Sequence, residues 1–248
     1  MTDDTDYIYT EADRGLLEGA FTVRSCKWMR SVEKRAQRFR RLFHQPRGRI
    51  RERVVENPLV AAALGQLPPG SRVADIGGAS SLLGLELVSL GHDVEVLDLR
   101  PSPLRHPRLT VRRVDLFEND LPDDSFDGIS CISVIEHVGL ERYGGKHHEN
   151  GDLLFMEELR RLCRQGGIIL LSAPYGRGHD PQVNGPPVGY RIYDRERLAR
   201  LIADFELIRL RFFVMQQGCW VEQDQADADT VATSRPIDAI FFAELKVT

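Results

Sequence analysis

Short apolar runs alternate with amphipathic segments over most of the chain after residue 70. The apolar runs that predict strands lie at 73–76, 94–97, 109–114, 126–134 and 168–173. Apolar residues spaced three and four positions apart predict helices at 82–90, 153–163 and 195–203. This alternation is typical of a parallel sheet covered by helices on both faces. Two later apolar runs, 207–214 and 239–247, predict strands that pair antiparallel across the acidic loop 222–229.

The pattern before residue 70 is different. Scattered apolar positions in residues 1–23 predict a mobile arm or a short helix. From Lys27 to Phe43 the apolar residues recur at helical spacing, with a basic opposite face. A second helix is predicted from about Ile50 to Leu67, where Pro68, Pro69 and Gly70 end it. We therefore expect an N-terminal arm with basic helices at 1–69 and an α/β domain at 70–248.

The composition narrows the class of protein. With 248 residues, 42% of them hydrophobic, the chain can bury a core without covalent links. Its four cysteines form no CxxC pair, so neither a zinc site nor a disulfide framework is expected. The acidic N-terminus is no secretory signal, and no run of about 18 apolar residues is present that could span a membrane. We expect a cytoplasmic protein with no membrane association.

The net charge of −4 hides a segregation of sign. Residues 24–53 carry 12 Lys or Arg and two acids, a net charge of +10, whereas the remaining chain has a net charge of −14. The basic segment could bind the phosphates of RNA or DNA. The acidic remainder disfavours a broad polyanion footprint, and no RNA-binding module is visible. We therefore expect no nucleic-acid partner and interpret the basic face as solvated, or as paired with acidic groups or a second subunit.

The stretch VADIGGASS, residues 73–81, places a turn of small residues between a strand and a helix, where α/β sheets bind ligands. It lacks the G-x-G-x-x-G fingerprint and the lysine of a P-loop. Asp75 at the strand end would repel a pyrophosphate and favour a ligand with an ammonium or sulfonium group. Asp98 ends the next strand, where an acid can accept hydrogen bonds from both ribose hydroxyls. The alternative is that both acids cap the helices that follow them.

Four segments in order carry a family resemblance: VADIGGASS, VEVLDLRP, VDLFENDLPDDSFDGISCISVIEHVG and ELRRLCRQGGIILLSAPYG. Together they resemble class I S-adenosylmethionine-dependent methyltransferases of the methyltransferase-11-like type. The resemblance implies a Rossmann-like, seven-stranded, mostly parallel α/β sheet with an antiparallel last strand. It also implies extra N-terminal helices that act as a lid or build a homodimer. The donor-site residues that it implies are Asp75, Gly77, Gly78, Ala79, Asp98, Leu99, Asp115, Leu116 and Ser133.

The segment after the fourth strand holds the candidate catalytic groups. Methylation of a hydroxyl needs a general base or a metal, and histidine suits proton abstraction near neutral pH. We interpret His147 or His148 as the base, with Glu136 and His137 shaping the donor side of the site. The alternative is that the two adjacent histidines belong to a solvated surface turn. A divalent ion such as Mg²⁺, held by Glu136, His137 and His148, is left open.

The stretch IEHVGLERYGGKHHENGD resembles methyltransferases encoded among bacterial saccharide and polysaccharide genes, including the actinobacterial mannoside 1-O-methyltransferase type. We expect a sugar to contact polar and aromatic side chains there and in the insert 175–194, although some of the insert tyrosines could instead pack it onto the sheet. These substrate residues are Tyr143, Tyr175, Arg177, Tyr190, Tyr193 and Trp220.

The predicted function is S-adenosylmethionine-dependent O-methylation of a saccharide hydroxyl, EC 2.1.1.-. Three alternatives stay open. They are N-methylation of a small amine, RNA methylation with the help of the basic helices, and a non-catalytic donor-binding module.

Overall fold

The computed structural model describes residues 50–184, 189–232 and 237–248. The predicted arm and the basic helix at 27–43 lie outside these residues. The described chain belongs to one compact unit, Ile50–Thr248. Helix α3 (Arg53–Leu64), which the sequence assigns to the N-terminal segment, is part of this unit.

The described residues form one eight-stranded sheet in the order β3-β2-β1-β4-β5-β8-β6-β7. Its strands are β1 (Arg72–Ile76), β2 (Asp93–Asp98), β3 (Leu109–Arg113), β4 (Phe126–Ile132), β5 (Cys163–Pro174), β6 (Glu206–Gln216), β7 (Cys219–Gln223) and β8 (Ala239–Lys246). The first five pair parallel, and β8 runs antiparallel between β5 and β6. The predicted α/β class with an antiparallel last strand is confirmed.

The predicted number of seven strands is one too low. Strand β7 pairs antiparallel with β6 after a tight turn at Gln217 and Gly218, both of which have positive φ. The predicted loop 222–229 is in fact the end of β7 followed by the short helix α8 (Gln225–Asp229). An edge strand of five mostly exposed residues buries little apolar surface, so it leaves no apolar run in the sequence.

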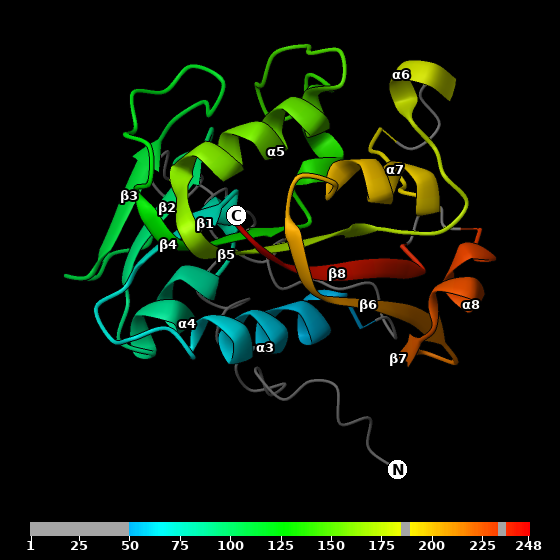
Figure 1. The fold of residues 1–248 in the computed structure, drawn as a ribbon, viewed down its shortest axis with the longest axis horizontal. Helices are drawn as coiled ribbons and strands as arrows, with labels where there is room; N and C mark the ends of the chain where they lie inside the picture. Colours follow the sequence, from blue (N-terminus) through cyan, green and yellow to red (C-terminus); the bar gives the residue numbers. More distant parts are fainter. Residues whose placement is uncertain (1–49, 185–188, 233–236) are drawn as a thin grey trace, which may run out of the picture. The chain divides into compact units, whose positions relative to one another are not determined.

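Helices cover both faces of the sheet (Figure 1). Helices α3 and α4 (Leu83–Ser89) pack on one face through residues such as Val60, Leu64 and Leu87. Helices α5 (Gly151–Leu162) and α7 (Arg195–Leu201) pack on the other face, where they share an apolar cluster with β4, β5 and β8. A further short helix, α6 (Pro181–Asn184), lies in the insert after β5.

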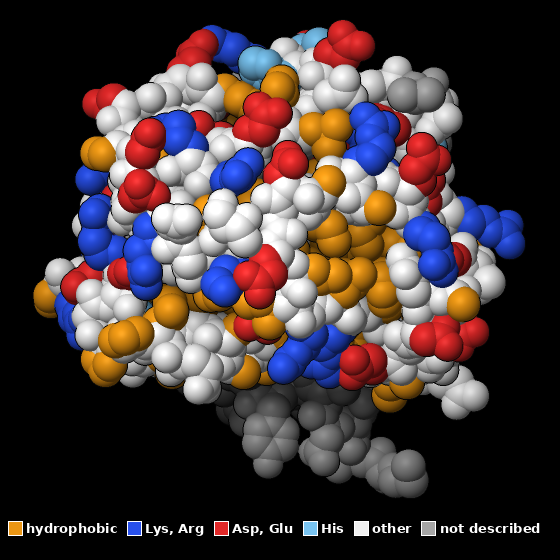
Figure 2. Space-filling view, in the orientation of Figure 1, with side chains coloured by type: hydrophobic (Ala, Val, Ile, Leu, Met, Phe, Trp, Pro, Cys, Tyr) orange, Lys and Arg blue, Asp and Glu red, His pale blue; other side chains and the backbone are white. Residues whose placement is uncertain are grey.

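On the face seen in Figure 2, apolar side chains show at the centre and charged side chains of both signs surround them. The described residues on this face form no broad basic surface of the kind that a polyanion would need. No helix among the described residues is long and apolar enough to cross a membrane.

The order of the strands reverses at β1. Strand β1 lies between β2 and β4. The chain continues from β1 to β2 on one side, whereas β4 pairs with β1 on the other side. Such a reversal of strand order opens a crevice at the carboxyl ends of the strands.

Candidate functional site

The turn after β1 requires its two glycines. Gly77 has a φ of 70°, and a Cβ there would lie 2.4 Å from Cγ2 of Val134. A Cβ on Gly78 would lie 2.1 Å from Oδ2 of Asp75. Neither position can therefore hold a side chain without a shift of its neighbours. The first motif of the family that the chain resembles is an acid followed by x-G-x-G-x-G. Asp75 and Gly77 match it, whereas Ala79 and Ser81 stand in place of its other two glycines.

Asp75 is buried beneath the turn. Its Oδ1 accepts a hydrogen bond of 2.9 Å from Oγ of Ser130, whereas its buried Oδ2 has no hydrogen-bond partner among the described residues. Burial raises the pKa of Asp75 to about 6. The unpartnered oxygen is suited to a cationic ligand that replaces the lost hydration.

Asp98 joins the end of β2 to the same turn. Its Oδ2 accepts a hydrogen bond of 3.0 Å from the backbone N–H of Ala79. The guanidinium of Arg100 donates to both carboxylate oxygens, at 3.0 and 2.9 Å, and lies 4.7 Å from the ring centroid of Tyr143. The structure thus brings Asp98, the glycine turn and the segment after β4 together.

The predicted donor-site residues Asp115 and Leu116 follow β3 and lie next to this group, since the N–H of Val114 donates to the carbonyl of Asp98. Leu116 is buried, and Oδ1 of Asp115 accepts a hydrogen bond of 3.1 Å from the N–H of Phe117. The ring of Phe117 stacks on His148 at a centroid distance of 4.1 Å. Leu99 is half-buried, and a Cβ on Gly145 would lie 3.3 Å from its Cδ1. The segment after β4 therefore approaches the segment after β2.

Helix α3 contributes two charged residues that sequence reasoning missed. Glu56 is fully buried and accepts hydrogen bonds from Oγ of Ser133, at 2.9 Å, and Oγ of Ser172, at 2.6 Å. Its burial raises its pKa. Arg53 donates to Glu56 and to the carbonyl of Ile132 at the end of β4.

A signal for Glu56 was present in the sequence. Glu56, Val60 and Leu64 recur every four residues, so the acid lies on the apolar stripe of α3. Ser133, with a φ of 49°, is held against Glu56 where β4 ends.

The 3₁₀ turn Ile135–His137 carries the candidate acid and a histidine. Glu136 is buried, and burial raises its pKa to about 8. Nε2 of His137 lies 3.8 Å from Oε1 of Glu136. The ring of His137 meets Tyr143 and Tyr190 edge-on, at centroid distances of 5.4 and 6.0 Å. Four of the predicted residues therefore gather here.

Arg191 fixes this turn from the insert. Its backbone N–H donates to the carbonyl of Glu136 at 2.9 Å, and its fully buried guanidinium donates to the carbonyl of Val138 at 2.5 Å. The same guanidinium contacts Asp180 and Gln182. The insert is thereby tied to the turn Ile135–His137.

Other predicted substrate residues lie elsewhere. Tyr175 is fully buried and donates to Asp229, and Tyr193 is fully buried and donates to Asp152, so both tyrosines belong to the core. Trp220 lies on edge strand β7, where its indole N–H donates to the carbonyl of Ile50. Arg177 is exposed. The structure does not bring these four residues to His137.

The predicted metal ligands also do not converge. No group of three or more His, Cys, Asp or Glu side chains in the described part of the chain could hold a metal ion. The reason is that His148 turns toward Phe117, whereas His137 lies between Tyr143 and Tyr190. His147 is exposed. A site built from Glu136, His137 and His148 is therefore not supported.

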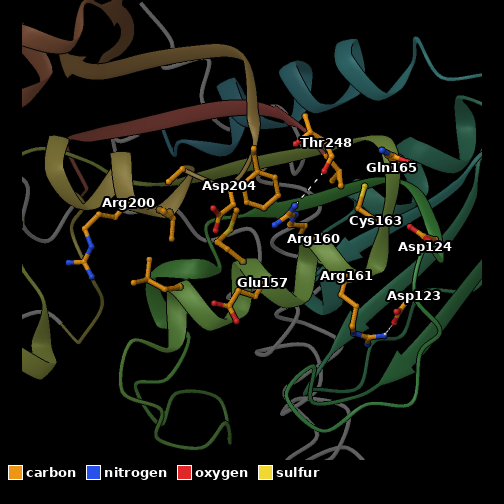
Figure 3. A pocket seen from close by; sticks show the side chains of 16 residues that line it. Asp123, Asp124, Glu157, Arg160, Arg161, Cys163, Gln165, Arg200, Asp204 and Thr248 are labelled. Atoms are coloured by element: carbon orange, nitrogen blue, oxygen red, sulfur yellow. Dashed lines mark hydrogen bonds and ion pairs between the residues drawn. The ribbon is translucent and has the colours of Figure 1, made fainter.

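A groove of about 690 Å³ lies away from this site, between α5, α7 and the start of β5 (Figure 3). Arg160 on its wall donates to the carbonyl of Thr248, and Arg161 pairs with Asp123. The groove opens at the amino ends of the parallel strands. Ligands of such sheets bind at the carboxyl ends, so we do not assign the groove to the predicted site.

The architecture is that of the class I S-adenosylmethionine-dependent methyltransferase fold. The family described as "Caenorhabditis protein of unknown function, DUF268" matches residues 106–229, half of the chain, and the chain belongs to this family.

Curated relatives agree with this fold. The chain is 28% identical over 122 residues to the ubiquinone biosynthesis O-methyltransferase of Xanthomonas campestris pv. campestris, covering 43% of this chain and 51% of that protein. It is 28% identical over 136 residues to a probable S-adenosylmethionine-dependent methyltransferase of Mycolicibacterium smegmatis, covering 52% of this chain and 48% of that protein. The chain thus spans about half the length of the curated relatives it matches.

Solved structures share the fold at low identity. The 1,6-didemethyltoxoflavin-N1-methyltransferase of Burkholderia thailandensis, with bound 1,6-didemethyltoxoflavin and S-adenosylhomocysteine, has a TM-score of 0.53 at 17% identity and covers 78% of this chain and 77% of its own. The [4+2]-cyclase SpnF has a TM-score of 0.55 at 16% identity, with coverages of 82% and 85%.

Proposed function

We propose that the protein is an S-adenosylmethionine-dependent methyltransferase, EC 2.1.1.-, whose substrate is a small polar molecule. We propose further that the methylated group is a hydroxyl of a saccharide. The proposal of S-adenosylmethionine as the donor rests on two acids, Asp75 and Asp98, which lie where the strand order of the sheet reverses. Asp75 offers a buried oxygen without a partner, and Asp98 is held at the glycine turn by Ala79 and Arg100. None of the relatives named above has a saccharide in its name, so the saccharide rests on the resemblance of the segment after β4.

The residues at the carboxyl ends of the strands fit the parts of this donor. Asp75 suits the ammonium of an amino acid, and Arg53 brings a guanidinium to the same edge of the sheet for a carboxylate. Asp98 can accept hydrogen bonds from ribose hydroxyls, and Leu99 and Leu116 offer apolar surface to an adenine. S-adenosylmethionine would supply a methyl group on a sulfonium, which leaves the protein chiefly with aligning the acceptor.

His137 is the base that the geometry favours for an acceptor hydroxyl. It lies within the group formed by Glu136, Tyr143 and Tyr190, and the exposed ring of Tyr143 can pack against the apolar face of a sugar. His147 is exposed and His148 stacks on Phe117, so each would have to reorient to reach the same place. A histidine there takes the hydroxyl proton as the oxygen attacks the methyl group.

Calorimetry with S-adenosylhomocysteine, followed by methyl transfer to a panel of sugars, amines and RNA, tests the proposal. We expect binding of the donor product and methylation of a sugar. A protein that does not bind the donor product would refute the methyltransferase function. Methylation of amines alone, or salt-sensitive binding and methylation of RNA, would refute the saccharide. Donor binding with no acceptor methylated would favour a non-catalytic module.

A further inference from the structure

Among the arginines of the site, Arg142 stands out because it has no acidic partner within the part of the chain that the structure describes. Arg100 pairs with Asp98, and Arg191 pairs with Asp180. Within the described ranges, the half-buried side chain of Arg142 makes no ion pair and no hydrogen bond. Its guanidinium lies 5.7 Å from the ring centroid of Tyr143.

The position of Arg142 is fixed by an unusual loop. Glu141 and Tyr143 both have positive φ, at 55° and 56°, a conformation that costs free energy for residues with side chains. A bridge between Leu140 and His147 closes the loop at its base. Such backbone strain persists where the surrounding structure holds it, so the loop presents Arg142 in a defined place.

The guanidinium of Arg142 faces the acceptor side of the site. A Cβ on Gly189 would lie 3.4 Å from its Nη1, so the side chain reaches the insert immediately before Tyr190. Tyr143 and Tyr190 are also the two rings that contact His137. Arg142 therefore lies on the loop that, together with the insert, surrounds the proposed base His137.

The other cations near this loop are already neutralised. Lys146 pairs with Glu118, and both carboxylate oxygens of Asp98 hold Arg100. A half-buried guanidinium that has lost part of its hydration gains most from a carboxylate or phosphate, which it can bind through two parallel hydrogen bonds.

We propose that Arg142 binds an anionic group of the acceptor, so that the substrate is an acidic sugar, with either a carboxylate or a phosphate near the methylated hydroxyl. This inference rests on the proposed function for the identity of the reacting group. The anion site itself depends only on the position of Arg142 between Tyr143 and Gly189.

Binding of three sugars to the protein saturated with S-adenosylhomocysteine tests the proposal. Calorimetry would compare glucose, glucuronate and glucose 6-phosphate. We expect at least one acidic sugar to bind at least tenfold more tightly than glucose. A preference for glucuronate would indicate a carboxylate, and a preference for glucose 6-phosphate a phosphate. If neither acid binds more tightly than glucose, the proposal is wrong.

Variants separate Arg142 from the general charge of the protein. Arg142→Gln should lose the preference for the acid, and Arg142→Lys should keep part of it. Arg200→Gln removes an exposed arginine of α7 that lines the separate groove of Figure 3, and it should keep the full preference. Unchanged preference in Arg142→Gln, with S-adenosylhomocysteine affinity intact, would overturn the assignment.

A chemical probe keeps the test independent of the donor and of variant folding. Phenylglyoxal should label Arg142 of the wild-type protein, and millimolar inorganic phosphate should slow that labelling severalfold, whereas glucose should not. Labelling that phosphate does not slow would contradict the anion site. Failure of the wild-type protein to bind S-adenosylhomocysteine would instead count against the proposed function alone.

Discussion

Replacing Arg191 with methionine removes a fully buried cation that ties the insert to the turn beneath it. The guanidinium donates to the carbonyl of Val138 at 2.5 Å, to Oε1 of Gln182 at 2.6 Å and to Oδ2 of Asp180 at 3.3 Å. Methionine can fill much of the space but donates no hydrogen bond. Three buried or half-buried acceptors would therefore lose this donor.

The loss of unfolding free energy depends on which charged side chains remain after the substitution. Removing one partner of a buried ion pair costs about 3–5 kcal/mol, chiefly because a buried charge is left uncompensated. Here Arg197 still contacts Asp152 at 2.8 Å and Asp180 at 2.6 Å, so these acids keep a cation. We therefore expect the lower end, about 3 kcal/mol, which lowers Tm by about 6–12 °C in a protein of this size.

Thermal and urea unfolding, followed by circular dichroism, measure this loss. Arg211→Met is the matched control, because Arg211 pairs with Glu222 on the surface, where the side chains are 26% and 48% exposed. A surface pair contributes about 0–1 kcal/mol, so the control should keep its Tm within about 4 °C. If Arg191→Met is no less stable than Arg211→Met, the buried network does not stabilise the insert.

Three further predictions concern the site. Asp98→Ala should weaken binding of S-adenosylhomocysteine by about 10- to 150-fold, because charge-assisted hydrogen bonds contribute about 1.5–3 kcal/mol. Unchanged affinity, measured by calorimetry, would contradict the role of Asp98. The pKa of Glu136 is raised to about 8 from 4.5, so its protonated form stabilises the fold at low pH and this contribution is lost as the pH rises toward 8. Between pH 5 and pH 8 the wild-type protein should therefore lose at least about 1.4 kcal/mol of unfolding free energy relative to Glu136→Gln, and parallel pH profiles in urea would argue against this titration. His137→Ala should lower turnover and leave donor affinity nearly intact, whereas His147→Ala should change neither; the opposite result would make His147 the base.

The local features of the donor site could be predicted from the sequence. Asp75 and Asp98 each follow an apolar run, and parallel strands deliver their carboxyl ends to one edge, so a short segment suffices to place both acids. Gly77 and Gly78 are required by the turn that they form. Such features depend on neighbours within a few residues and on the sheet order that the strand–helix alternation implies.

The partners of buried polar groups could not be predicted in this way. Glu56 meets Ser172 across 116 positions of the chain, and Arg191 meets Val138 across 53. The sequence of either segment does not predict its partner, because such contacts form only when the helices and the insert have packed onto the sheet. The tyrosines of the insert show the same limit, since Tyr193 turns into the core and Tyr190 toward His137.

By itself, the sequence determined the class of fold and the positions of Asp75 and Asp98 at the ends of strands, because period and strand ends are local properties of the chain. The tertiary structure decided which polar side chains share a place. It placed Tyr175, Tyr193 and Trp220 away from His137, separated His148 from His137, and brought Arg53 and Glu56 to the end of β4. The physical reason is burial, since each polar group packed into the interior must find a partner there, and distant segments supply it.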